Sequence, residues 1–151
     1  MGHSLSAVYI HGVFSTKNRH PYFEERALRD QLHTVLAGIS NQRGCQSLQV
    51  GGVADHGHIL ARMNRTVTIA DWMKEVKRES SIWVKQIEPL FTDFQWQSGY
   101  GAFSIAYRLL EDTTRYIAQQ ERHHQALTFQ DEYRLLLSRH GLEWDERYVW
   151  D

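Results

Sequence analysis

The stretch that organises this chain is VADHGHILA at residues 53–61, where two histidines one residue apart run into an apolar segment. The pattern predicts a β-strand that begins near His56. Successive side chains of a strand point to opposite faces, so His56 and His58 share one face and Gly57 lies on the other. Two imidazoles on one face can supply two ligands of a metal site. With nine histidines in 151 residues the pair can also arise by chance, so a third ligand has to be sought elsewhere.

The composition bounds the class of protein. A length of 151 residues fits one domain, residues 1–151, with a proper buried core. The hydrophobic content of 42% and the charged content of 23% are ordinary for a globular protein. No apolar run approaches the length that crosses a membrane, and no signal-peptide pattern opens the chain. The single Cys45 excludes an internal disulfide and suits a reducing compartment, so we expect a cytoplasmic protein with no membrane partner.

Charge is distributed unevenly along the chain, although the net charge is only −1. Residues 1–90 carry 11 Lys or Arg against 8 Asp or Glu, a balance of +3. Residues 91–151 carry 6 against 10, a balance of −4. A polyanion is therefore expected to meet the N-terminal part through a local basic patch rather than a globally basic surface.

Hydrophobic periodicity predicts the elements of the chain. In the first half we expect a strand, a helix and two further strands, at residues 7–15, 23–41, 46–53 and 56–63. In the second half we expect a helix, a strand and two helices, at residues 68–86, 99–105, 107–124 and 129–139. Gly44 ends the first helix and Thr68 is the N-cap of the second. The order of elements predicts an α+β fold, an antiparallel sheet with helices packed on one face.

The helix at 68–86 bears a stripe of cations apart from its apolar face. The stripe consists of Lys74, Lys77, Arg78 and Lys85. Glu75 and Glu79 offset it only in part, so the face is net positive. Two interpretations stay open on this pattern, an ordinary solvated face and a surface that contacts phosphates.

A third metal ligand can come from the helix at 107–124. Tyr116 and Gln120 are four residues apart and therefore neighbours on one helical face. If that face meets the face bearing His56 and His58, the Gln120 carbonyl oxygen can be the third ligand, with Tyr116 one turn away. A nearby cation favours the phenolate form of Tyr116. The cation also polarises the phosphate that the phenolate would attack. The alternative is that Tyr116 only packs and Gln120 is solvated.

Several motifs in this order resemble the single-tyrosine HUH transposases, including the stand-alone, REP-associated type. The motifs are FSTKNR at 14–19, DHGH at 55–58, WQSGYGAFS at 96–104, YIAQQERHH at 116–124, HG at 140–141 and DERYVWD at 145–151. The resemblance covers nearly the whole chain. It implies the ferredoxin-like or RRM-like HUH fold.

The resemblance also implies the chemistry. The chain would be a metal-dependent enzyme that cuts and rejoins single-stranded DNA, with Tyr116 attacking a phosphate to leave a 5′-phosphotyrosine and a free 3′-OH. His56, His58 and Gln120 would hold Mg²⁺ or Mn²⁺, and imidazole ligands suit Mn²⁺ better. Members of the family recognise hairpins near element ends. The basic residues expected to bind DNA are Lys17, Arg19, Lys74, Lys77 and Arg78.

The chain departs from the family pattern at three positions. Gly57 stands where a bulky hydrophobe is usual, and Ala54 stands where proline is common. Gln119 stands where relatives often have Asn. Because Gly57 points away from the ligands, its lack of a side chain should weaken packing beneath the strand rather than remove a ligand. We therefore expect an active enzyme.

Three other functions remain open on the sequence. One is a domesticated protein of the same fold that nicks or binds genomic hairpins. Another is a catalytically idle DNA-binding protein. The third is a metal-dependent hydrolase in which water attacks instead of tyrosine. A covalent protein–DNA adduct separates the transposase from the last two.

A homodimer is expected for two reasons. Relatives are dimers, and transposition needs two DNA ends cut together, which two tyrosines in one particle would supply. The strand at 7–15 is a plausible edge of the sheet, and an open edge invites pairing with a second copy.

Overall fold

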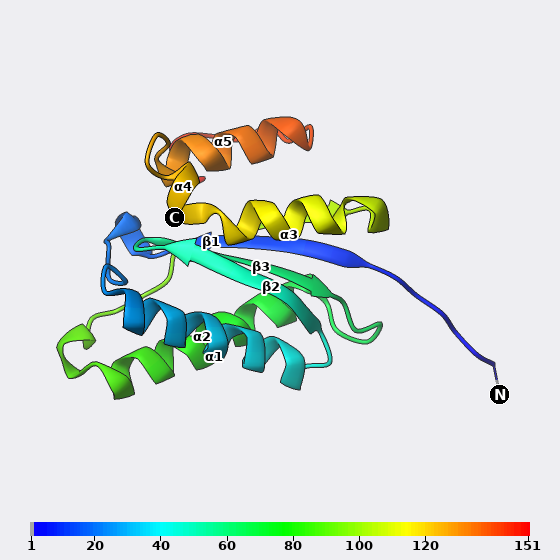
Figure 1. Cartoon of the computed structure of the whole chain (residues 1–151), viewed down its shortest axis with the longest axis horizontal. Helices are drawn as coiled ribbons and strands as arrows, with labels where there is room; N and C mark the ends of the chain where they lie inside the picture. The colour runs from blue at the N-terminus through cyan, green and yellow to red at the C-terminus, as the bar shows by residue number, and fades with distance from the viewer. Residues whose placement is uncertain (1) are drawn as a thin grey trace.

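The structure, a computed structural model, describes residues 2–151. A four-stranded antiparallel sheet lies at its centre, with the strand order β2-β3-β1-β4 (Figure 1). The strands are β1 (Tyr9–Ser15), β2 (Gln46–Val53), β3 (His56–Arg62) and β4 (Gly101–Ile105). The α-helices are α1 (Arg26–Gln42), α2 (Ile69–Ile87), α3 (Leu110–Ala118), α4 (Gln120–His123) and α5 (Phe129–Arg139). Three short 3₁₀ turns are η1 (Lys17–Arg19), η2 (Pro89–Phe91) and η3 (Tyr107–Leu109).

Helices cover both faces of the sheet. Figure 1 shows α1 and α2 below it and α3, α4 and α5 above it. The predicted α+β class with an antiparallel sheet is confirmed, but the placement of all helices on one face was wrong. Every residue of β1 is buried. A strand buried on both faces needs cover on both sides, so a single helical layer could not complete this fold.

The first strand lies in the interior of the sheet, which corrects its prediction as an edge. β1 pairs with β3 on one side, where Val13 faces His58, and with β4 on the other, where Val13 faces Gly101. Its apolar residues point both ways, Phe14 into the core under α1 and α2 and Val13 into the cluster under α5. The edges of the sheet are β2 and β4. β1 therefore has no open edge through which a second copy could pair, contrary to the prediction.

Local signals set the ends of most helices. Thr68 caps α2 as predicted, since its hydroxyl accepts a hydrogen bond from the Asp71 amide at 3.0 Å. Gly44 follows α1 at φ 75°, a left-handed conformation that favours glycine. The helix predicted at 107–124 is interrupted, because Gln119 leaves helical geometry with φ −101° and ψ 22°. This break separates α3 from α4 and fixes the direction of the side chains that follow it.

Glycine lets α3 approach the sheet closely. A Cβ on Gly51 of β2 would lie 2.4 Å from the Ile117 carbonyl oxygen of α3, so a side chain there would push the helix away. Gly57 faces the opposite side, toward Leu36 and Phe14. A Cβ there would make only ordinary contacts at 3.8–4.0 Å, so this residue lies away from His56 and His58, as expected. None of the helices in residues 2–151 is long and apolar enough to cross a membrane.

Candidate metal centre and nucleophile

His56 and His58 project from β3 toward the layer of α3, α4 and α5. Both side chains are buried. His56 Nδ1 lies 2.7 Å from a carboxylate oxygen of Asp55, and His58 Nδ1 lies 2.8 Å from His11 Nε2. These contacts occupy both Nδ1 atoms and direct both Nε2 atoms inward. A metal-ligating histidine characteristically has a partner on its other ring nitrogen, which orients the ring.

Two further donor groups meet these Nε2 atoms. Gln120, at the start of α4, places Oε1 3.0 Å from His56 Nε2. Glu132 of α5 places Oε1 3.2 Å from both His56 Nε2 and His58 Nε2. The ligand atoms of His56, His58 and Glu132 all lie within 4.8 Å of one another. His124 Nε2 lies 3.0 Å from the same Glu132 oxygen and 3.1 Å from Gln120 Oε1.

Tyr116 of α3 stands beside this cluster in the same chain. Its hydroxyl donates a hydrogen bond to Glu132 Oε2, the oxygen that also accepts from Gln120 Nε2 at 2.9 Å. The centroid of its ring lies 6.0 Å from that of His58. The ring stacks on that of His123, with 4.7 Å between the two centroids. The tyrosine and both histidines of one chain therefore lie close together.

The electrostatics of the cluster follow from burial and from Glu132. Burial would lower the pKa of His56, but hydrogen bonds with Asp55 and Glu132 raise that pKa to about 9. Burial lowers the pKa of His58, and Glu132 only partly offsets it. Burial alone would raise the pKa of Glu132, but hydrogen bonds with three histidines hold it far below the usual range. Burial and the Glu132 charge raise the pKa of Tyr116 well above its ordinary value, so the phenol is protonated at rest.

The donor set fits a divalent cation. Two imidazole nitrogens, one amide oxygen and one carboxylate oxygen converge from β3, α4 and α5. Imidazole suits Mn²⁺, and carboxylate and amide oxygens suit Mg²⁺ and Mn²⁺. His56 would have to lose its proton for metal to bind, as ligands must be deprotonated.

Comparison with known proteins agrees with this geometry. The sequence model of the family described as "Transposase IS200 like" matches residues 4–120, more than half of the chain. The chain belongs to this transposase family. The matched segment contains His56, His58, Tyr116 and Gln120, and ends before α5. The resemblance predicted from the sequence motifs is therefore confirmed.

Solved structures show that the fold is also that of transposases. One is a candidate transposase from Deinococcus radiodurans R1, 21% identical, with a TM-score of 0.62 over 80% of this chain and 96% of that chain. Another is a REP-associated tyrosine transposase bound to a REP hairpin, 11% identical, with a TM-score of 0.60 over 84% of this chain and 74% of that chain. These likenesses confirm the predicted fold. No curated protein matches the chain significantly.

The basic residues of this IS200-like transposase fall into two neighbouring places. Lys74, Lys77 and Arg78 of α2 line one surface hollow of about 410 Å³ together with the backbone near Gln95. Lys17 of η1 lines an adjoining hollow of about 480 Å³, which also contains Gln95. The two predicted basic segments are therefore neighbours in the fold, although almost 60 residues separate them in the sequence.

The basic side chains differ in what they contact. Lys77 Nζ donates to the backbone carbonyls of Gln97 and Ser98, at 2.9 and 3.2 Å, and to that of Gly99. Burial lowers the pKa of Lys77 to about 8. Arg78 pairs with Glu75 at 2.7 Å, whereas the Lys17 and Lys74 side chains are exposed. Arg19 donates to the Trp150 carbonyl at 2.7 Å, which ties η1 to the C-terminal tail.

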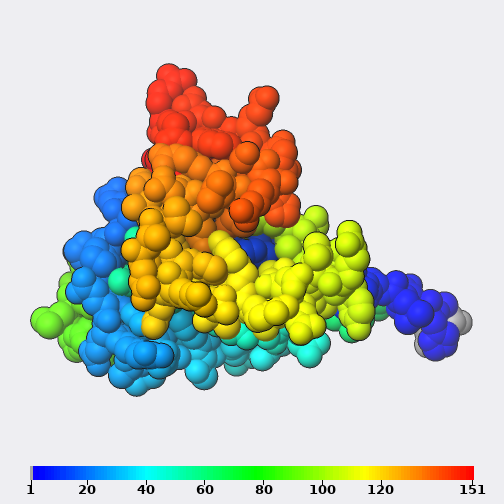
Figure 2. Space-filling view, turned by 45° about the horizontal axis from the view of Figure 1, so that its top comes forward, coloured from blue at the N-terminus to red at the C-terminus, as the bar shows by residue number. Residues whose placement is uncertain are grey.

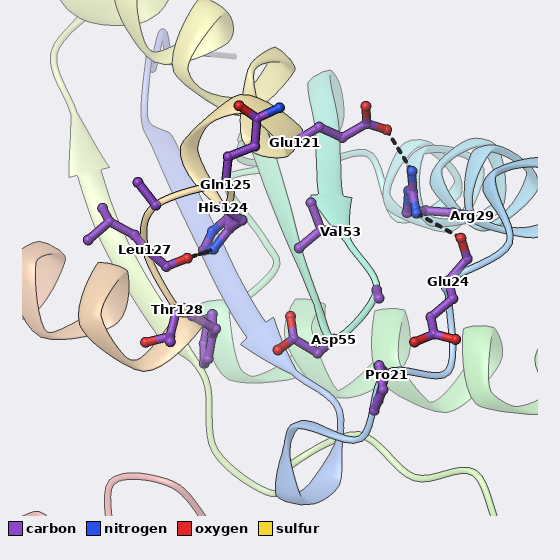
Figure 3. Close-up of a pocket in the computed structure, with 13 residues that line it drawn as sticks. Pro21, Glu24, Arg29, Val53, Asp55, Glu121, His124, Gln125, Leu127 and Thr128 are labelled. Carbon is purple, nitrogen blue, oxygen red and sulfur yellow. Dashed lines mark hydrogen bonds and ion pairs between the residues drawn. The ribbon is translucent and has the colours of Figure 1, made fainter.

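Surface hollows reach the cluster from two sides of the transposase fold. Figure 3 shows the hollow of about 660 Å³ that Asp55 and His124 line, with the Arg29–Glu121 ion pair at its rim. Another hollow, of about 310 Å³, lies between α3 and α5 and has Tyr116 and His11 in its lining. In Figure 2 the blue of β1 shows between the yellow of α3 and the orange of α5. Tyr116 is half-buried and is thus accessible through this second hollow.

Three residues of the cluster were not predicted as site residues, namely His11, His124 and Glu132. A signal for Glu132 was present. It lies three residues after Phe129 and four before Leu136, so it falls on the apolar face of the predicted helix at 129–139. A charged side chain on an apolar helical face needs a buried partner. His11 gave no such signal, because its contact with His58 depends on the pairing of β1 with β3.

Proposed function

We propose that this chain is a transposase that cleaves and rejoins single-stranded DNA by transesterification through a 5′-phosphotyrosine. The observation that carries the proposal is the convergence of Tyr116 with His56, His58 and Gln120 in one chain of the IS200-like family. The single domain 1–151 would hold the complete site. Hairpin-containing element ends are the proposed substrate, supported by the REP hairpin bound to the structural relative.

The residues divide the reaction between them. The Tyr116 oxygen forms a bond to phosphorus as the bond from phosphorus to the 3′ oxygen breaks, and that oxygen leaves as a 3′-OH after taking up a proton. The hydrogen bond to Glu132 orients the Tyr116 hydroxyl, whose proton passes to solvent while the leaving 3′ oxygen takes one up from solvent. When bound, Mg²⁺ or Mn²⁺ supplies the positive charge that polarises the phosphate. Attack by a 3′-OH on the phosphotyrosine reverses the sequence and rejoins DNA without ATP.

The basic residues would hold the DNA outside the cluster. We propose that Lys17, Arg19, Lys74 and Arg78 contact phosphates. Lys17, Lys74 and Arg78 line two hollows that share Gln95, and Arg19 lies in η1 with Lys17. Lys77 would contribute by holding the Gln97–Gly99 backbone in place. Contacts of this kind are electrostatic and independent of sequence.

We also propose that the enzyme works as a homodimer, since joining two DNA ends requires two tyrosines. The sheet edges through which a second copy could pair are β2 and β4. Light scattering at micromolar concentration should give the mass of two chains. A monomeric mass with cleavage retained would contradict this part of the proposal.

The test is incubation with single-stranded oligonucleotides that carry the ends of the host element, with Mn²⁺, followed by a denaturing gel. Wild-type protein should give a covalent adduct, and Tyr116→Phe should give none while DNA affinity stays nearly unchanged, because the hydroxyl is needed only for attack. Tyr107→Phe is the matched control, since Tyr107 is 77% exposed and belongs to no part of the cluster. An undiminished adduct with Tyr116→Phe would overturn the proposal.

A further inference from the structure

Glu132 is a buried carboxylate whose surroundings call for a cation. It is 2% exposed, and among residues 2–151 its ion-pair partners are three histidines, with no Lys or Arg. Oε1 lies 3.2 Å from His56 Nε2, 3.2 Å from His58 Nε2 and 3.0 Å from His124 Nε2. Buried charges in proteins are paired or coordinate metals. The charge of Glu132 is therefore balanced either by a proton held among these histidines or by a metal ion bound in its place.

Donor atoms for a cation converge on the inner side of His56. Its Nδ1 faces the Asp55 carboxylate at 2.7 Å, which directs Nε2 toward Gln120 Oε1 at 3.0 Å and Glu132 Oε1 at 3.2 Å. Glu132 Oε1 also lies 3.2 Å from His58 Nε2. Metal binding takes the proton from His56, and a cation bound between these four atoms would contact all of them.

The spacing of the donor atoms matches the edges of a coordination shell. Adjacent ligands around an octahedral cation with bonds of about 2.1 Å are about 3.0 Å apart. Gln120 Oε1 is 3.0 Å from His56 Nε2, and Glu132 Oε1 is 3.2 Å from the Nε2 atoms of His56 and His58. Glu132 thus stands at the ligand distance from both histidines, as Gln120 does from His56.

We propose that Glu132 of α5 is a metal ligand, so that the site is His56, His58, Gln120 and Glu132. This deepens the proposed function and rests on its metal site. Without Glu132 the three ligands are neutral, whereas carboxylate oxygens are the preferred ligands of Mg²⁺ and Mn²⁺. Glu132 Oε1 faces the histidines, while Oε2 accepts hydrogen bonds from the Tyr116 hydroxyl and the Gln120 amide. The Glu132 side chain would therefore hold the nucleophile beside the metal. The residue lies beyond the family match, which ends at residue 120.

The test measures Mn²⁺ binding to the metal-stripped full chain without DNA, by titration calorimetry and by water-proton relaxation. Glu132→Gln should weaken binding more than about 100-fold, beyond the 10–100-fold typical of partners outside the coordination shell. The relaxation measurement should show one additional water on Mn²⁺, in the place of the lost oxygen. Asp131→Asn is the matched control, because it removes the same charge from the adjacent, exposed position of α5.

Each outcome decides the proposal. A loss below about 100-fold with an unchanged number of bound waters would place Glu132 outside the coordination shell and overturn it. If Glu132→Gln does not fold, Glu132→Leu, which also lacks the carboxylate, is measured instead, and Mn²⁺ binding as tight as in wild type would equally overturn it. The adduct assay stays separate. If wild type forms the adduct but Mn²⁺ binding does not depend on Glu132, only the assignment of Glu132 as a ligand is refuted. If Mn²⁺ binding depends on Glu132 but no adduct forms, only the proposed transposase reaction is refuted.

Discussion

The two faces of the central sheet are built from the same strands but do different work. On the face covered by α1 and α2, Phe14 and Ile59 belong to a large apolar core around Trp72. On the other face, the same two strands present His11 and His58, which are buried without becoming apolar. Alternation along β1 and β3 therefore separates a stabilising face from a chemical one. We therefore expect that a side chain on one face can be replaced with little direct effect on the other face.

The polar face is held in place by a smaller apolar cluster. The cluster consists of Val13, Phe103, Phe129, Tyr133, Leu136 and Leu137 and fastens α5 to β1 and β4. Glu132 extends from this same helix into the polar site. The position of the carboxylate thus depends on ordinary packing one turn away. Buried polar groups are costly when left without partners, so the face should tolerate few single changes without loss of activity.

The largest effect is expected from a change on the chemical face. His58→Ala removes one ligand, and DNA cleavage should fall about 1,000-fold or more because several kcal/mol of charge stabilisation are lost. Excess chelator should do the same to wild type, reversibly. The free energy of unfolding should fall by only about 1–3 kcal/mol, since His11 and Glu132 each lose one hydrogen bond. Cleavage is measured on a denaturing gel. Full cleavage by the variant, or by wild type in excess chelator, would show that the reaction does not need a metal.

The reverse pattern is expected on the stabilising face. Phe14 is fully buried, with its ring edge-on to Trp96 at 4.8 Å. Phe14→Ala should lower the free energy of unfolding by about 3–5 kcal/mol, measured by urea denaturation. The cleavage rate per folded molecule should stay within about tenfold of wild type, because no ligand is touched. A stable Phe14→Ala protein without activity would show that the two faces are not separable.

The smallest effects distinguish two lysines of α2. Lys74→Met should reduce the slope of DNA affinity against salt concentration by about one and leave stability unchanged. Lys77→Met should leave the slope unchanged and lower the free energy of unfolding by about 1–3 kcal/mol, because three backbone carbonyls lose their donor. The matched pair is measured by fluorescence anisotropy at several salt concentrations. If both variants reduce the salt dependence of DNA affinity equally, Lys77 contacts a DNA phosphate as Lys74 does.

Local sequence patterns predicted much of this molecule. The alternation around Gly57 places both histidines on one face. Tyr116 and Gln120 both reach Glu132, although the helix predicted to join them is interrupted at Gln119. Each of these inferences needed only a few consecutive residues. The cap at Thr68 is of the same kind.

The features that the sequence did not predict depend on contacts between distant segments. Whether β1 is an edge or an inner strand is decided by β3 and β4, which pair with it from far along the chain. The residues on both sides of Gln119 have good helix propensity, so the sequence does not predict the break there. The break lies where the chain changes direction from α3 to α4 beside the site. Glu132 joined the site only because α5 folds back onto the sheet, which no spacing within the helix specifies.

In the proposed reaction, Tyr116 on the chemical face of the sheet attacks DNA. The most direct measurement is mass spectrometry of the peptide that stays linked to DNA after the adduct is formed with Mn²⁺ and digested with protease. We expect one modified residue, Tyr116, joined to the 5′-phosphate at the cleavage site. A DNA link at Tyr100, at Tyr107 or at any residue other than Tyr116 would contradict it, as would cleaved DNA that carries no peptide.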